Sequence, residues 1–188
     1  GDIFTPQPQK TRDVVPILKM LKRIQPTVIS LAFDPEGSGP DTHYKVLQAL
    51  AEALIQWKKE KDLSALRIIG YRNVWYKFHP SEANVFTPVS LNSMAVLDWS
   101  FKNCYISQVD ASFPSPELDG PFSDLSRQIW VEQYKRVQLV LGKDFFYDNE
   151  SPKIRSTHGM IYYKEMSIDE FLMQARELEK SMEGEIRY

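Results

Sequence analysis

The sequence predicts an α/β fold in which helices flank a doubly wound, mostly parallel sheet. Two short runs of β-branched and apolar residues, 27–33 and 66–71, have the composition of buried strands. One stretch of apolar residues at helical spacing precedes the first run, and a second lies between the two runs. Because parallel strands need crossover helices, this alternation favours a Rossmann-like sheet, of which we expect the chain to hold an N-terminally truncated part.

The ends of the chain set the expected domain boundaries. Residues 1–12 are expected to form a flexible lead-in, because Pro6 and Pro8 lack backbone donors and restrict the residues before them. The chain opens on glycine rather than methionine, which suggests a remnant of expression joined to an excised piece. We therefore expect a single α/β domain over residues 13–182, the C-terminal portion of a larger one, and a tail over residues 183–188.

The first helix is expected to begin at Asp13, which can cap it, with Pro16 tolerated in the first turn. Pro26 ends the helical pattern, and the first predicted strand follows it directly. The apolar residues of this helix recur at helical spacing: Val14, Ile17, Leu18, Leu21 and Ile24.

The segment after the first strand, residues 34–41, must form a loop. It carries two glycines, two prolines and three acidic residues. A second helix is expected to start with Asp41 or Thr42 as its cap and to run to about Lys61. The second strand, 66–71, comes next.

Beyond the second strand the periodicity loosens, and we expect one more strand near residues 83–89. Ser90 then caps a predicted helix that runs through Cys104. Cys104 shares a helical face with Leu97 and Phe101 and has no evident activating base, so we expect it to be a buried packing residue.

Two further helices are predicted from their ends. One has Asp124 near its start and Gly142 at its end. The last begins after Ser167, which forms a capping box with Glu170 three residues on. No internal repeat and no low-complexity tract is present in the sequence.

Composition excludes several classes of function. A formal net charge of −2 and an isoelectric point of about 6.0 argue against nucleic acid and anionic membrane as partners. Cys104 is the only cysteine, which excludes an intrachain disulfide framework and a multi-cysteine zinc site and favours a reducing compartment. No apolar run approaches the roughly 18 residues of a membrane span, so we expect a cytoplasmic protein.

The loop over residues 34–41 is the most informative candidate site, because ligands of doubly wound sheets bind outside the carboxyl ends of strands. His43 follows this loop, and Asp34, Glu36 and Asp41 lie close to it in sequence. An imidazole near carboxylates can ligate Zn²⁺ or exchange protons. A structural or capping role for His43 is the alternative.

The residues Thr42-His43-Tyr44-Lys45-Val46, after an acidic loop rich in proline and glycine, resemble the third motif of the PIG-L/LmbE-type de-N-acetylases. In that family the last histidine of the motif ligates zinc, so the resemblance gives this role to His43. Three later phrases, YRNVWYKFHPSEANVFTPVS, DGPFSDL and IRSTHGMIYYKEMSIDEF, resemble the carboxyl-terminal region of glucosamine-6-phosphate deaminase-like fusion proteins. These join an aminosugar deaminase/isomerase domain to a de-N-acetylase-like domain, and the resemblance covers most of residues 13–182.

The chain departs from the family pattern at the metal site. It lacks the first motif, HPDDE, which supplies a histidine ligand, an aspartate ligand and the general base. Gly39 or Glu36 stands where the third motif usually has its leading histidine. Catalytic zinc takes three protein ligands and an open water position. The resemblance therefore implies that zinc and the general base belong to the intact parent protein, and that this chain alone does not hydrolyse an N-acetyl sugar.

Three further residues are candidates for contact with a substrate: Arg72, His79 and Asp41. Arg72 follows the second strand, where its guanidinium could bind a sugar phosphate bidentately; a surface ion pair is the alternative. His79, before Pro80 and among aromatic residues, could approach a substrate or could pack or form a backbone hydrogen bond. For His158, in a polar turn, a structural role is favoured.

The resemblance implies two partners: an amino-sugar or sugar-phosphate ligand, and the upstream deaminase domain of the same protein. A homodimer is expected because missing N-terminal strands would leave an exposed sheet edge. Two other functions stay open. The chain could be a non-catalytic module for oligomerisation or sugar-phosphate binding, or an unrelated small α/β protein.

Overall fold

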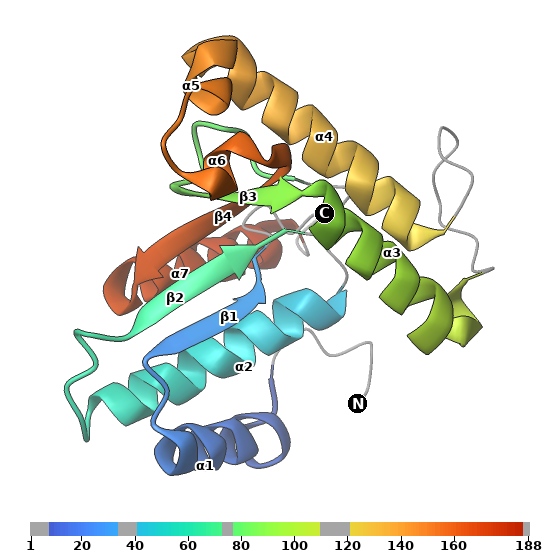
Figure 1. The fold of residues 1–188 in the computed structure, drawn as a ribbon. Helices are drawn as coiled ribbons and strands as arrows, with labels where there is room; N and C mark the ends of the chain where they lie inside the picture. Colours follow the sequence, from blue (N-terminus) through green and yellow to red (C-terminus); the bar gives the residue numbers. More distant parts are fainter. Residues whose placement is uncertain (1–7, 34–40, 73–76, 110–120, 186–188) are drawn as a thin grey trace. The chain divides into compact units, whose positions relative to one another are not determined.

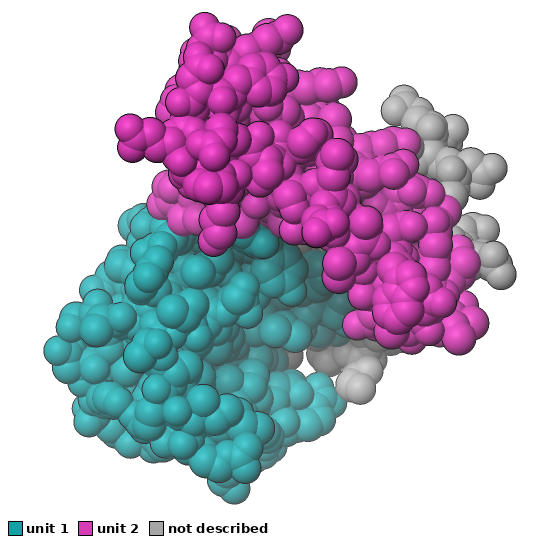
Figure 2. All heavy atoms as spheres, viewed as in Figure 1, with its two compact units in different colours: residues 1–78, 163–188 teal, residues 79–162 magenta. Residues whose placement is uncertain are grey.

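The computed structural model describes residues 8–33, 41–72, 77–109 and 121–185, with only the backbone described at residues 41 and 182–185 (Figure 1). The chain divides into two compact units, coloured in Figure 2. The first unit comprises residues 1–78 and 163–188, and the second unit comprises residues 79–162. A four-stranded sheet combined with helices confirms the predicted α/β class.

The first unit contains the predicted strand–helix–strand segment. Its elements are η1 (Lys10–Val14), α1 (Val15–Ile24), β1 (Val28–Ala32), α2 (Asp41–Lys58), β2 (Arg67–Tyr71), the end of β4 (Thr157–Ser167) and α7 (Ile168–Glu185). The first helical segment begins earlier than predicted, at Lys10, as a π-helical turn. Asp13, the predicted cap, lies inside this turn, where its carboxylate accepts from Arg12 and from the Gln9 backbone N–H (2.8 Å). These hydrogen bonds lower the pKa of Asp13 to about 2.

The sheet is mixed, with the strand order β1-β2-β4-β3, where β3 comprises Val85–Ser90. β1 and β2 are parallel, and Val28 pairs with Arg67 at one end and Ala32 with Tyr71 at the other. β2 and β4 are antiparallel. The predicted parallel arrangement therefore holds for β1 and β2, while β4 adds an antiparallel neighbour.

The core of the first unit lies between the sheet and the helices α2 and α7. Phe33 and Phe171 are 1% and 0% exposed, and their ring centroids lie 6.4 Å apart. A Cβ atom at Gly70 of β2 would lie 2.7 Å from the Cβ of Phe33, so glycine at this position leaves room for the buried Phe33 side chain. The buried Gln48 of α2 donates from its amide to the carbonyl of Ala175 (2.9 Å), which joins α2 to α7.

The second unit is mostly helical. Its elements are β3, α3 (Leu91–Cys104), η2 (Ile106–Gln108), α4 (Phe122–Leu141), α5 (Lys143–Tyr147), α6 (Pro152–Arg155) and the start of β4. Ser90 caps α3 as predicted, because its hydroxyl accepts from the Ser93 N–H at 3.2 Å. Gly142 ends α4 with φ of 84°, a conformation that favours glycine.

Tyr162 organises the core of the second unit. Its hydroxyl donates to the carbonyl of Gln133 on α4 (2.7 Å), and its ring meets Phe86 of β3 edge-to-face at 5.0 Å. A Cβ atom at Gly159 would lie 3.0 Å from the Cβ of Trp130, so a side chain there would push α4 away from β4. Together these contacts hold β3 and α4 against the first half of β4.

Further sequence interpretations differ from the structure. The strand β4 was not predicted, and His158 lies at its start rather than in a turn. Cys104 is exposed, so its predicted burial is wrong. Phe122 of α4 covers this face of α3 at Phe101, with ring centroids 5.9 Å apart, one turn before Cys104 ends the helix.

Candidate functional site

The carboxyl ends of β1 and β2 form one edge of the sheet in the first unit. The two strands end in register, since Ala32 pairs with Tyr71 and the N–H of Phe33 donates to the Tyr71 carbonyl at 2.7 Å. Figure 1 shows the start of α2 on the side to which the arrowheads of β1 and β2 point. Ligands of α/β sheets bind at such an edge. We call it the carboxyl edge.

His43 lies in the first turn of α2 and is half-buried. Asp41 begins this helix, but its side chain lies outside the described residues, as do Asp34 and Glu36. Within the described part of the chain, no group of three or more His, Cys, Asp or Glu side chains could hold a metal ion. The described donor set therefore does not complete a zinc site around His43, which needs three protein ligands.

Arg72 leaves β2 at the same carboxyl edge. It is half-buried, and its guanidinium carbon lies 4.6 Å from the centre of the Phe78 ring. Phe78 is only 3% exposed, so this cation–π contact holds the guanidinium against a buried surface. A guanidinium presented in this way has a planar set of donors suited to a phosphate or carboxylate group.

His79 is the first residue of the second unit and is exposed. Its backbone N–H donates to the Glu82 carboxylate (2.8 Å), and its Nδ1 accepts from the backbone N–H of Ser81 (3.3 Å). Since Nδ1 acts as an acceptor, the proton of the neutral ring is assigned to Nε2. The side chain thus closes a local turn and keeps one nitrogen for an outside contact.

His158 and its neighbour Arg155 also make local contacts. The Nδ1 of His158 lies 2.9 Å from the Ser156 carbonyl, to which it can donate. Arg155 donates to the carbonyls of Asn149 (2.6 Å) and Glu150 (2.9 Å). These local hydrogen bonds give both side chains a structural role.

Across the described ranges, the chain contains no helix that is both long and apolar enough to cross a membrane. Comparisons with protein-family models, curated proteins and solved structures found no match for the chain. Its function must therefore be argued from the residues of the site.

Proposed function

We propose that this chain is the C-terminal portion of a zinc-dependent de-N-acetylase-like domain that acts on an N-acetyl amino sugar, within a glucosamine-6-phosphate deaminase-like protein. The observation that carries the proposal is that His43 and Arg72 belong to segments leaving β1 and β2 at one carboxyl edge. We further propose that strands from outside these 188 residues complete a doubly wound, Rossmann-like sheet.

In this proposal each residue has a separate role. His43 is a zinc ligand, and the remaining ligands and the general base come from an HPDDE-like segment that this sequence does not contain. Arg72 binds the phosphate of the sugar. Zinc, when bound, lowers the pKa of its water and polarises the amide carbonyl.

The test compares this chain with one extended upstream through an HPDDE-like segment. Zinc affinity is measured by competition with a chromogenic chelator, and activity by release of acetate from N-acetylglucosamine 6-phosphate. The proposal expects only the longer chain to bind zinc and to hydrolyse the sugar. His43→Ala should lower its zinc affinity by more than about 100-fold, since even outer partners of a zinc ligand contribute about 10–100-fold.

His158→Ala is the matched control, because His158 makes only local hydrogen bonds at the start of β4. It should leave zinc affinity and rate unchanged. A longer chain that binds no zinc, or that loses nothing on His43→Ala, would contradict the catalytic proposal.

The second candidate is a non-catalytic module that binds a sugar phosphate or forms a dimer. The contact of Arg72 with Phe78 favours this candidate, because it holds the guanidinium at the carboxyl edge. A guanidinium binds a phosphate directly, so such a site needs no metal ion. This candidate expects the 188-residue chain alone to bind glucosamine 6-phosphate but not glucosamine in calorimetric titration.

The dimer form of this candidate rests on β1, the first strand in the order of the sheet. Its outer edge can pair with another strand, as an equivalent edge of a second copy would. Light scattering at increasing protein concentration should then report twice the chain mass. A monomer at every concentration would remove this part of the proposal.

A further inference from the structure

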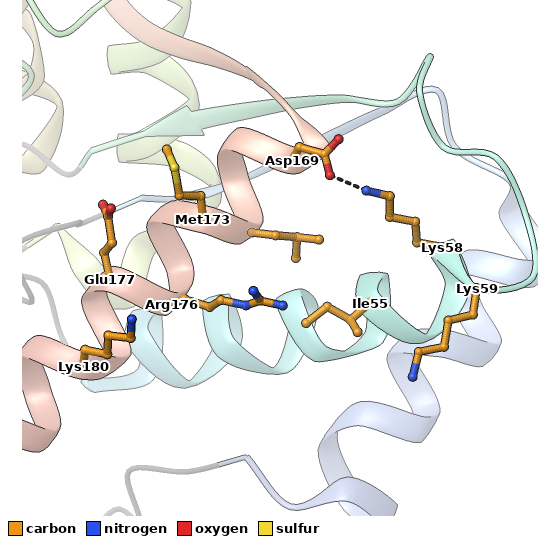
Figure 3. Close-up of a pocket in the computed structure, with 9 residues that line it drawn as sticks. Ile55, Lys58, Lys59, Asp169, Met173, Arg176, Glu177 and Lys180 are labelled. Carbon is orange, nitrogen blue, oxygen red and sulfur yellow. Dashed lines mark hydrogen bonds and ion pairs between the residues drawn. The ribbon is translucent and has the colours of Figure 1, made fainter.

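An open groove of about 490 Å³ lies between α2 and α7 in the first unit (Figure 3). Ile55 comes from α2, and Leu172 and Met173 come from α7; these three residues form its apolar part. Leu172 is 9% exposed, whereas Met173 is 52% exposed. We call this hollow the α2–α7 groove. A second hollow of about 420 Å³ shares Ile55, Leu172 and Arg176 with it, and its lining adds Lys10 and two acidic residues, Glu52 and Glu179.

Four basic residues border the groove: Lys58 at the end of α2, Lys59 directly after it, and Arg176 and Lys180 on α7. Figure 3 shows Arg176 reaching from α7 towards Ile55. Lys58 forms an ion pair with Asp169. Among the side chains that the structure describes, Lys59, Arg176 and Lys180 make no hydrogen bond or ion pair, and Glu177 is the only other acidic residue of this lining.

Several other basic residues of the first unit are paired. Lys22 binds Glu60, Arg67 binds Glu165, and Lys164 lies 3.6 Å from Glu170. In the groove, by contrast, Arg176 and Lys180 stand four residues apart on one helix, a spacing at which like charges repel. An anionic partner would remove this repulsion.

The shape of the groove decides between two kinds of anionic partner. Small-molecule sites are concave and bury about 70–90% of their ligand. This groove is open, and its lysines are exposed on flexible stems that are poorly organised for one small anion. An apolar floor with charged borders between two helices instead has the form that accepts the apolar face of a third helix.

We propose that the α2–α7 groove docks an acidic amphipathic helix of a partner protein. Apolar residues of this helix at positions i, i+3 or i+4, and i+7 cover Ile55, Leu172 and Met173. Its carboxylates pair with Lys59, Arg176 and Lys180. Ile55 follows His43 by twelve residues, about 18 Å along α2 at about 1.5 Å per residue, so this site does not depend on the proposed function.

The test uses two designed, fluorescently labelled helical peptides of about 20 residues, a length that supports helix formation in water. Both carry leucine along one face; one has glutamate on its flanks, and the other has lysine. Fluorescence anisotropy is recorded during titration with the full chain. The glutamate peptide should bind and the lysine peptide should not, and binding should weaken when NaCl rises from about 0.05 M to about 0.5 M.

The combined substitution Lys59→Glu, Arg176→Glu and Lys180→Glu should weaken binding of the glutamate peptide by about tenfold or more. Lys19→Glu is the matched control, because Lys19 is an exposed residue of α1 outside the groove; it should leave binding unchanged. Met173→Glu places a carboxylate in the exposed apolar part and should also weaken binding, with an unchanged circular dichroism spectrum confirming the fold.

Three results would overturn the proposal. The two peptides could bind equally, or the triple substitution could leave the affinity of the glutamate peptide unchanged. Inorganic pyrophosphate could also bind through the same three basic residues while neither peptide binds, which would make the groove a site for small anions.

Discussion

Two arginines of the first unit lie in opposite surroundings. Arg72 is half-buried, with its guanidinium 4.6 Å from the centre of the Phe78 ring. Arg176 is exposed in the α2–α7 groove and makes no ion pair among the described side chains. A guanidinium held against a ring loses little freedom when it binds a small anion, whereas an exposed one gains most from a large partner that orders several cations at once.

The carboxyl edge and the α2–α7 groove are built on the same hydrophobic core. A substitution in this core is therefore expected to have the largest effect and to disrupt both sites. Phe171 is 0% exposed and packs on Phe33, and Phe171→Ala should lower the free energy of unfolding by about 3–5 kcal/mol. Met173→Ala, two residues along the same helix but 52% exposed, should change it by less than about 0.5 kcal/mol. Urea denaturation of both variants measures the difference; equal losses would show that α7 does not pack as described.

Replacing each of the two arginines by lysine, one at a time, distinguishes the carboxyl edge from the α2–α7 groove. Arg72→Lys keeps the charge but loses the planar pair of donors, and should weaken glucosamine 6-phosphate binding by about tenfold. Arg176→Lys should leave that binding unchanged and should alter peptide docking by less than about threefold, because an exposed cation acts there mainly through its charge. Calorimetric titration and fluorescence anisotropy on the same variants check both statements. Equal effects of the two substitutions on sugar-phosphate binding would remove the distinction.

A paired cation in the second unit, Lys102, provides the reference for the exposed cations of the α2–α7 groove. The Asp98 carboxylate accepts from Ser123 (2.7 Å) and Lys102 (2.9 Å), and these hydrogen bonds lower the pKa of Asp98. Its pKa is lower in the folded state, so this stabilisation is present above the unfolded value near 3.8 and is lost as pH falls through the folded value.

Asp98→Asn should therefore lower the free energy of unfolding by about 0.5–1 kcal/mol at neutral pH, a small value because solvent screens a carboxylate that is 36% exposed. At acidic pH the difference from the unsubstituted chain should shrink, since the unsubstituted carboxyl is then protonated too. Denaturation at several pH values tests this. A difference that stays constant with pH would mean that the charge of Asp98 does not contribute.

The sequence predicted those elements whose causes are local. Ser90, Gly142 and Ser167 cap helix ends through contacts within a few residues, and the strand runs 27–33 and 66–71 are rich in β-branched and apolar residues. These features can be recognised without knowing the fold.

The strand β4 could not be recognised in this way. Its neighbour β2 lies far away in sequence, and the charged Glu165 is accommodated in β4 because it pairs with Arg67 of β2. The residues Tyr162-Tyr163-Lys164-Glu165 also break the alternation of a half-buried strand. Pairing between distant residues, rather than local pattern, makes this segment a strand.

The candidate sites also differ in whether local sequence or distant packing determines them. The carboxyl edge with His43 and Arg72 follows from the parallel order of two predicted strands. The α2–α7 groove depends on packing between helices that are more than a hundred residues apart in sequence, as the contact of Gln48 with Ala175 illustrates. The like charges of Arg176 and Lys180 at helical spacing were the one local indication of this groove.

X-ray absorption of zinc bound to the chain extended upstream through an HPDDE-like segment is the decisive measurement for the role of His43. We expect a zinc ion with imidazole and carboxylate ligands, and the loss of one imidazole from the spectrum on His43→Ala. An unchanged ligand set in His43→Ala, while the protein still binds zinc, would contradict the placement of His43 in the metal site.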